Sequence, residues 1–165
     1  MATEAFRGEF YQKVDSKARV SIPAAMRRIL DLANPQEGTR ATVIMIYGAG
    51  GKFAQCYSPK GAQALYDLIA QHPIGKHKDD LELRFVSRSA EVEIDDDGRL
   101  VLPPKVRDRM GVTPDILANG FMAAFAGKID RFELWMGDPY DAANPQSGDD
   151  DDPATIRAGL TVPAS

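Results

Sequence analysis

Two arginines and two aspartates recur at the same spacing in two places of this 165-residue chain. Asp15 stands four residues before Arg19, and Asp95 stands four residues before Arg99. A guanidinium group at this spacing can pair with the carboxylate and so hold a turn. It can also bind phosphates or guanine edges in DNA. One guanidinium can do both, so the pattern leaves the two uses open.

The recurrence extends beyond these four residues. Residues 14–23 lie 80 positions before residues 94–103, and both segments follow one pattern: apolar, Asp, three small or polar residues, Arg, apolar, any, apolar, Pro. The match continues past the proline, where Arg27 corresponds to Arg107. A doubled segment of this length indicates an internal repeat.

Each copy predicts a strand, a turn, a second strand and a short helix. Polar and apolar residues alternate in the first strand, as in a half-buried strand, and the second strand is short and apolar. An aspartate begins the turn, where its carboxylate can accept hydrogen bonds from backbone N–H groups further on. A proline suits the first turn of the helix. The predicted strands are 9–14, 20–22, 91–94 and 100–102, the turn aspartates are Asp15 and Asp95, and the prolines are Pro23 and Pro103.

Two more strands, separated by a glycine turn, follow in each half. Between the halves, Ser58 is a good N-cap with Pro59 at the first helical position, which predicts a helix that stops before Pro73. A second helix is predicted over 79–87. The fold class is therefore mainly β with short helices (α+β). The additional predicted strands are 42–47, 53–57, 116–125 and 131–135.

The charge of the chain is unevenly distributed. The net charge is -4, but residues 138–165 hold six acids and one base, which leaves 18 acids and 19 bases over residues 1–137. The tail is rich in Asp, Pro, Gly, Ser and Ala, a composition that predicts disorder. The predicted parts are a first repeat (8–57), a helical connector (58–88), a second repeat (89–137) and an acidic tail (138–165).

The repeated segment, with Arg19, Arg27 and Arg28 at fixed offsets, resembles the DNA-binding core of the AbrB-type swapped-hairpin regulators. Two such copies, with Phe6-Arg7-Gly8 before them and the segment 131–135 near their end, resemble the MraZ family more closely. The resemblance covers about residues 5–137. It implies two AbrB-like repeats packed as an intramolecular pseudo-dimer barrel, and assembly of such units into a ring.

The same resemblance implies a transcriptional regulator of the division and cell-wall gene cluster, which binds short direct repeats in double-stranded DNA upstream of its own operon. One position departs from the family. The usual turn glycine of the first copy is Ala18, whereas the second copy keeps Gly98. If the turn requires a positive φ, an alanine there costs about 1 kcal/mol.

The two copies differ in charge. The window 9–30 holds five bases and two acids, whereas the matching window 90–110 holds four bases and six acids. A polyanion should therefore prefer the first half. By the resemblance, Arg19, Arg27 and Arg28 lie on the DNA face, while a solvated helix face is the alternative for the last two. Lys13 and Lys17 suit non-specific phosphate contacts. The candidate DNA-binding residues are Arg7, Lys13, Lys17, Arg19, Arg27 and Arg28, with Arg99 and Arg107 as the secondary positions of the second repeat.

An enzymatic function is not expected. Asp95, Asp96 and Asp97 have no histidine, cysteine or glutamate cluster nearby to complete a catalytic or metal site, so no metal and no cofactor are expected. No apolar run is long enough to cross a bilayer, and the expected location is the cytoplasm, in association with the nucleoid. The alternative function is an oligomeric interaction or antitoxin-like protein whose acidic tail binds a protein partner. The two-copy layout counts against this alternative.

Overall fold

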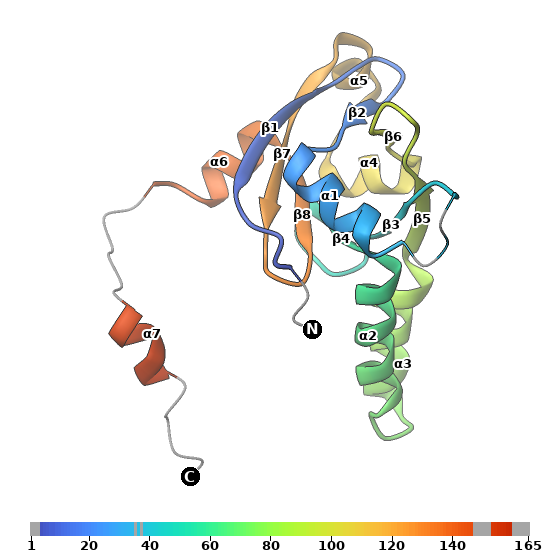
Figure 1. The fold of residues 1–165 in the computed structure, drawn as a ribbon, viewed down its shortest axis with the longest axis vertical. Helices are drawn as coiled ribbons and strands as arrows, with labels where there is room; N and C mark the ends of the chain where they lie inside the picture. The colour runs from blue at the N-terminus through green and yellow to red at the C-terminus, as the bar shows by residue number, and fades with distance from the viewer. Residues whose placement is uncertain (1–3, 35, 37, 147–152, 160–165) are drawn as a thin grey trace.

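The computed structural model describes residues 4–34, 36, 38–146 and 153–159. Its body is an antiparallel sheet of six strands in the order β1-β7-β8-β4-β3-β5, and a separate two-stranded ribbon pairs β2 with β6. The fold is thus mainly β with short helices (Figure 1). The strands are β1 (Glu9–Val14), β2 (Arg19–Ser21), β3 (Thr42–Ile46), β4 (Phe53–Tyr57), β5 (Ser89–Glu93), β6 (Arg99–Val101), β7 (Phe121–Gly127) and β8 (Phe132–Met136).

The strand order is symmetric under exchange of the two copies. Exchanging β1 with β5, β3 with β7 and β4 with β8 gives the same strand order, read from the opposite edge of the sheet. Strands of one half therefore pair with strands of the other: β1 with β7, β4 with β8 and β3 with β5. The sheet is open, with β1 and β5 at its edges, and no closed barrel is formed by the described strands.

The main core lies on the inner face of this sheet. Helix α1 (Ala24–Leu32) buries Met26 and Leu30, and helix α4 (Pro104–Met110) buries the corresponding Val106 and Met110. Side chains of both halves, Phe125 and Met45 among them, belong to the same buried cluster. Burial of this apolar surface is therefore shared between the halves, which makes each half depend on the other.

The two turns adopt the same backbone conformation. Ala18 has a φ of 63° and Gly98 a φ of 79°, so the first turn does require a positive φ at a residue with a β-carbon. The Ala18 side chain is 1% exposed and belongs to the main core. The backbone cost at Ala18 is thus opposed by burial of its methyl group, which contributes about 0.8 kcal/mol.

The connector is a helical hairpin that projects from the sheet (Figure 1). Helix α2 (Pro59–Ala70) starts at Ser58, whose Oγ accepts a hydrogen bond from the N–H of Gly61 at 3.0 Å. Helix α3 (Lys76–Glu82) begins three residues earlier than expected and continues as a π-helical turn over Leu83–Ser87. The connector covers the outer face of β3 and β4, where Ile46 and Tyr57 are buried.

Residues 116–119, which were expected to begin a strand, are helical. Helix α5 (Pro114–Asn119) is capped by Thr113, whose Oγ1 accepts the N–H of Ile116 at 3.3 Å. The helix ends at Gly120, which has a φ of 72°, and β7 starts only after it. The capping threonine and the following proline outweigh the apolar composition of this segment.

The start of the expected disordered tail belongs to the body. Helix α6 (Gly137–Ala143) packs on the outer face of β7 and β8, where Tyr140 is 5% exposed and contacts Ala124, Ala126 and Trp135. The expectation of disorder is therefore wrong for this segment, because one buried tyrosine anchors it. A further helix, α7, covers Pro153–Gly159, and the aspartates at 149–152 lie outside the described residues. No helix of the described chain is long and apolar enough to span a membrane.

Candidate nucleic-acid interface

The first turn is held by the carboxylate of Asp15. Its Oδ1 accepts the backbone N–H groups of Lys17 and Arg19, both at 2.9 Å, and its Oδ2 lies 2.7 Å from Nε of Arg19. These hydrogen bonds, the backbone one from Arg19 above all, hold the pKa of the Asp15 carboxyl below its ordinary value. The Arg19 side chain remains 40% exposed. It can thus stabilise the turn and still present N–H donors to a ligand.

The second turn repeats this geometry with an additional carboxylate. Oδ1 of Asp95 accepts the N–H groups of Asp97 and Arg99 at 2.9 Å. The hydrogen bond from the Arg99 N–H is the main cause that lowers the pKa of the Asp95 carboxyl. Nε of Arg99 lies 3.4 Å from Oδ2 of Asp95, and its Nη2 lies 3.2 Å from Oδ2 of Asp97. Arg99 is therefore shared between two carboxylates, whereas Arg19 has one.

The ribbon of β2 and β6 brings these two arginines onto one face. Its register pairs Arg19 with Val101 and Ser21 with Arg99. Val20 and Leu100, which alternate with them, are buried. The outward face of the ribbon thus carries two half-exposed guanidinium groups related by the exchange of halves. A two-stranded ribbon has a width that the major groove of B-DNA admits.

Arg27 does not lie free on the helix surface. Its Nη2 donates to the backbone oxygen of Asp96 at 3.4 Å, and its Nε lies 3.7 Å from Oδ2 of Asp31. The guanidinium lies over Gly98, where an added β-carbon would stand 2.4 Å from Nη1. Arg27 of the first half therefore clamps the turn of the second half.

Arg107, the counterpart of Arg27, makes a different contact. Its Nη1 donates to the backbone oxygen of Leu102 at 2.9 Å. It is half-buried, like Arg27. The secondary position Arg107 thus binds the chain just before its own helix.

The remaining candidate cations lie at two ends of β1. Lys13 and Lys17 are exposed beside the first turn. Arg7 precedes β1, which at about 3.3 Å per residue places it about 20 Å from that turn. Arg28 pairs with Glu4 at 2.7 Å, and so lies toward the Arg7 end. The structure therefore brings Lys13, Lys17 and Arg19 together and separates Arg7 and Arg28 from them.

Arg40 is a charged residue of this region that sequence reasoning missed. Its guanidinium pairs with Glu93 at 2.9 Å and with Asp96 at 3.2 Å, and these hydrogen bonds, the one to Glu93 first, raise the pKa of Arg40. It stands just before β3, and the pairing of β3 with β5 brings the three groups together. No local spacing signals a contact between residues 56 positions apart.

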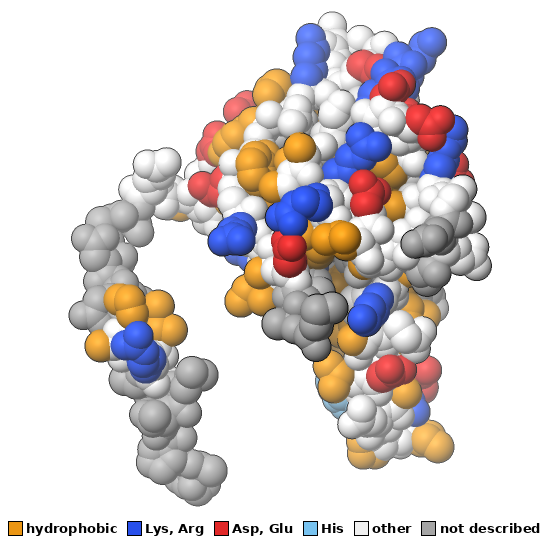
Figure 2. Space-filling model, viewed as in Figure 1, with side chains coloured by type: hydrophobic (Ala, Val, Ile, Leu, Met, Phe, Trp, Pro, Cys, Tyr) orange, Lys and Arg blue, Asp and Glu red, His pale blue; other side chains and the backbone are white. Residues whose placement is uncertain are grey.

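The charges near the ribbon are therefore of mixed sign. Figure 2 shows lysine and arginine side chains interspersed with acidic ones at the upper end of the molecule, over the turns of both copies. Arg40 forms an ion pair with Asp96 and Arg99 forms one with Asp97, so these arginines and the acids of the second turn partly neutralise each other. Lys13 and Lys17 have no carboxylate within 4.0 Å among the described residues. The first turn consequently carries the cations most available to a polyanion.

The described residues contain no group of three or more His, Cys, Asp and Glu side chains placed to hold a metal ion. The single cysteine, Cys56, is buried, and burial raises the pKa of its thiol. A thiol that stays protonated is a poor nucleophile.

Comparison with known proteins identifies relatives over most of the chain. This chain is 42% identical to the transcriptional regulator MraZ of Cereibacter sphaeroides, over 84% of this chain and 84% of that protein. The proteins of the same name from Ruegeria pomeroyi and Parvibaculum lavamentivorans are 35% and 29% identical over 82% and 83% of this chain, and over 80% and 79% of their own lengths. No protein-family model matches the chain. On the similarity to these relatives, the chain belongs to the MraZ family of transcriptional regulators.

Proposed function

We propose that this transcriptional regulator binds double-stranded DNA sequence-specifically through the β2–β6 ribbon and the turn at 15–18. The observation that carries the proposal is the outward face of the ribbon, where Arg19 and Arg99 stand half-exposed with their guanidinium planes fixed by turn carboxylates. A fixed guanidinium can bind a guanine edge bidentately, and each good contact of this kind discriminates by about 1–3 kcal/mol.

In this proposal the chain consists of two AbrB-like swapped-hairpin repeats, at 8–57 and 89–137, which form an intramolecular pseudo-dimer around the shared core. The pairing of strands across the halves and the symmetric strand order support it. The two repeats contribute unequally to DNA binding. Lys13, Lys17 and Arg19 make the first repeat the stronger contact, because the acids of the second repeat reduce its attraction for phosphate.

The target is proposed to be a set of short repeats upstream of the chain's own operon, within the division and cell-wall gene cluster, bound in the cytoplasm at the nucleoid. Several copies of the chain act together as a ring. The open edges at β1 and β5 support assembly, since an unpaired strand edge favours association with another chain. Assembly raises DNA affinity, because sites linked in one ring bind at high effective concentration.

Fluorescence anisotropy with labelled duplexes tests this function. The full chain should bind its own upstream region at a salt concentration where a shuffled duplex of equal length and composition is not bound. Affinity should fall steeply as salt rises, because counterions are released from each contacted phosphate. Equal affinity for the two duplexes at every salt concentration would contradict sequence-specific binding. Binding of a co-purified protein in place of DNA would favour the antitoxin-like alternative.

A further inference from the structure

The outward face of the β2–β6 ribbon holds one apolar side chain among polar ones. Arg19 and Ser21 of β2 share this face with Arg99 and Val101 of β6, because the residue between them in each strand is buried. Val101 is 53% exposed. One exposed apolar side chain is ordinary on a protein surface. Val101, however, lies within the face that is proposed to contact DNA bases.

The register of the ribbon places Val101 directly beside Arg19. The N–H of Leu102 donates to the backbone oxygen of Ala18 at 2.9 Å, so the adjacent residues Arg19 and Val101 face each other as a pair without backbone hydrogen bonds. In such pairs the side chains lie closest, with about 4.5–5.5 Å between their β-carbons. Val101 and Arg19 therefore contact the same small area of a bound ligand.

The Arg19 side chain leaves Val101 open to a ligand. Nε of Arg19 lies 2.7 Å from Oδ2 of Asp15, which holds the guanidinium at the turn. The two neighbours suit different base edges, because a guanidinium binds guanine and an apolar side chain contacts the C5-methyl group of thymine. Successive bases of one strand are about 3.4 Å apart, which is close to the spacing of the two side chains. A guanine bound by Arg19 and a thymine bound by Val101 can therefore be neighbours.

The two halves of the chain differ at this position. The counterpart of Val101 in the first repeat is Ser21, and a serine hydroxyl contacts several bases without discriminating strongly among them. The second turn attracts phosphate weakly, because Arg99 is shared between two carboxylates. An apolar contact with a methyl group does not depend on charge, so these acids do not weaken it. The second repeat can thus add specificity where it adds little electrostatic affinity.

We propose that Val101 is a specificity-determining residue, whose methyl groups contact the C5-methyl of a thymine in the major groove beside the base bound by Arg19. This role rests on the proposed binding of DNA by the ribbon. The first repeat then supplies most of the charge, and the second repeat recognises one thymine in each bound site.

Replacement of thymidines by deoxyuridine tests this contact, because deoxyuridine keeps the base pair and removes only the C5-methyl group. The thymidines of the chain's own upstream region are replaced one at a time, and affinity for the full chain is measured by fluorescence anisotropy. At one thymidine in each bound site, replacement should weaken binding of the wild-type chain about fourfold, which corresponds to about 0.8 kcal/mol for one buried methyl group. If no replacement weakens binding of the wild-type chain, the proposal is wrong.

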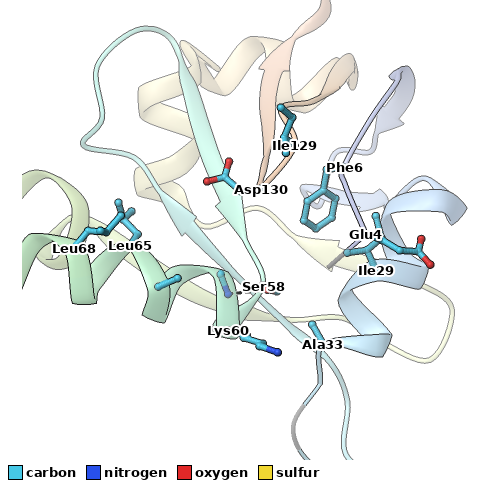
Figure 3. Close-up of a pocket in the computed structure, with 12 residues that line it drawn as sticks. Glu4, Phe6, Ile29, Ala33, Ser58, Lys60, Leu65, Leu68, Ile129 and Asp130 are labelled. Carbon is cyan, nitrogen blue, oxygen red and sulfur yellow. Dashed lines mark hydrogen bonds between the residues drawn. The ribbon is translucent and has the colours of Figure 1, made fainter. Parts of the chain in front are cut away.

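Val101→Ser assigns the effect to this side chain. The variant gives the second repeat the residue of the first, and the sensitive thymidine should become insensitive to replacement. Leu68→Ser is the matched control, because Leu68 is 60% exposed on α2. It lies at an apolar groove of about 330 Å³ between α1, α2 and the turn between β7 and β8, away from the ribbon (Figure 3). Leu68→Ser should keep the fourfold effect, and an equal effect in Val101→Ser would contradict the contact.

Two further measurements separate this role from other causes. Light scattering should give the same mass for Val101→Ser and the wild-type chain, and a smaller assembly would show that Val101 contacts a second copy of the chain instead of DNA. Equal affinity of the wild-type chain for the upstream region and the shuffled duplex would refute the proposed function itself. Preference for the upstream region without any dependence on a thymine methyl group would refute only the role of Val101.

Discussion

The guanidinium of Arg27 lies over the α-carbon of Gly98, so that a β-carbon at this position would stand 2.4 Å from Nη1. The equivalent pair in the other half is Arg107 and Ala18. There the turn residue has a buried β-carbon, and Arg107 donates instead to the backbone oxygen of Leu102. The second turn is therefore clamped by an arginine of the first half through a space that only glycine leaves free.

Gly98→Ala should destabilise the protein in two ways: it strains the backbone at a positive φ, and its β-carbon displaces the guanidinium of Arg27. The φ of 79° costs an alanine about 1–2 kcal/mol, and the displacement of Arg27 adds to this. In an Arg27→Ala background the contact is already absent, so only the backbone cost should remain. Chemical denaturation of the four proteins of this cycle measures the difference. An equal cost of Gly98→Ala in both backgrounds would show that Arg27 is not displaced.

The matched substitution in the first turn is Ala18→Gly. Relief of the positive φ should contribute about 1 kcal/mol, while loss of the buried methyl group should cost about 0.8 kcal/mol. The free energy of unfolding should therefore change little. A stabilisation of about 1 kcal/mol would indicate that the Ala18 methyl makes no useful contact, because only the relief of the positive φ would then remain.

Arg19→Ala should reduce DNA affinity far more than Arg99→Ala, although both positions are equivalent in the repeat. Arg19 pairs with one carboxylate and Arg99 with two, and the cations around Arg19 are unopposed. Loss of a phosphate contact at Arg19 should also lower the salt slope by about one unit. Anisotropy titrations at several salt concentrations measure both effects.

Melting temperature separates this DNA effect from a loss of folding. Both ion pairs are about 40% exposed on the arginine side, so solvent screens them and each should contribute little to the free energy of unfolding. The two substitutions should therefore lower the melting temperature to a similar, small extent. Equal losses of DNA affinity would contradict the asymmetry between the halves.

DNA binding should require several operator repeats at once. A single chain contributes few unopposed cations and should bind one repeat weakly, whereas linked sites on one assembly should gain about 100-fold or more. Titration of duplexes with one, two and three repeats measures this gain, and light scattering gives the mass of the assembly. Equal affinity for all three duplexes, or a strictly monomeric mass, would rule out this account.

The docking of α6 should weaken in alkaline solution. Tyr11 donates a hydrogen bond to Asp141, and this bond is the main cause that raises the pKa of Tyr11 from 10.0 to about 12. A raised pKa means that the stabilisation is complete below pH 10 and is lost as the pH rises toward about 12. Trp135, whose ring lies 5.8 Å from that of Tyr140, should report the loss by fluorescence.

Two variants assign this transition. Tyr11→Phe removes the titrating group next to Asp141, so the Trp135 transition should lose its component between pH 10 and 12. Tyr66→Phe changes a tyrosine on α2, which covers the other end of the sheet, and should leave the transition unchanged. An unchanged transition in Tyr11→Phe would show that other groups release α6.

Removal of the acidic tail should strengthen DNA binding or leave it unchanged. The chain should be ended after Gln146, because α6 belongs to the body. This removes four aspartates, which compete with DNA phosphates for the same cations, and one arginine. The effect should be largest at low salt, because the Debye length at 0.15 M is only about 8 Å. Loss of DNA binding on this truncation would contradict the proposed location of the interface.

A second truncation, after Gly137, serves as the contrast. It removes Tyr140 from its contacts with Ala124, Ala126 and Trp135, and loss of one buried aromatic side chain should cost about 1.5–3 kcal/mol. The first truncation should leave the melting temperature unchanged, because the removed residues follow the last contact of α6 with the sheet. Equal melting temperatures for the two truncated proteins would contradict this account of α6.

Local patterns in the sequence were sufficient for the elements whose interactions are local. The Asp15–Arg19 turn, the Ser58 cap of α2 and the strand at Phe53–Tyr57 depend on contacts within a few residues, or on alternation along one strand. The strand expected over 116–125 is wrong in its first part, because the Thr113 cap and Pro114 start a helix over Pro114–Asn119, and the strand begins only at Phe121. The sequence left open whether the first turn needs a positive φ, and the structure shows that Ala18 adopts one.

The tertiary structure alone decided which charged side chains remain available to bind DNA phosphates. Arg27 reaches a carbonyl 69 positions away, and Arg40 reaches a carboxylate 56 positions away, and no spacing in the chain encodes either contact. Tyr140 anchors α6 by a contact 131 positions away, against a local composition typical of disorder. The repeat and its turns follow from short-range hydrogen bonding and side-chain alternation. The contact of Arg27 with the second turn, the pairing of Arg40 with Asp96 and the docking of α6 through Tyr140 follow from packing between segments far apart in the sequence. Only the folded chain brings these segments into contact.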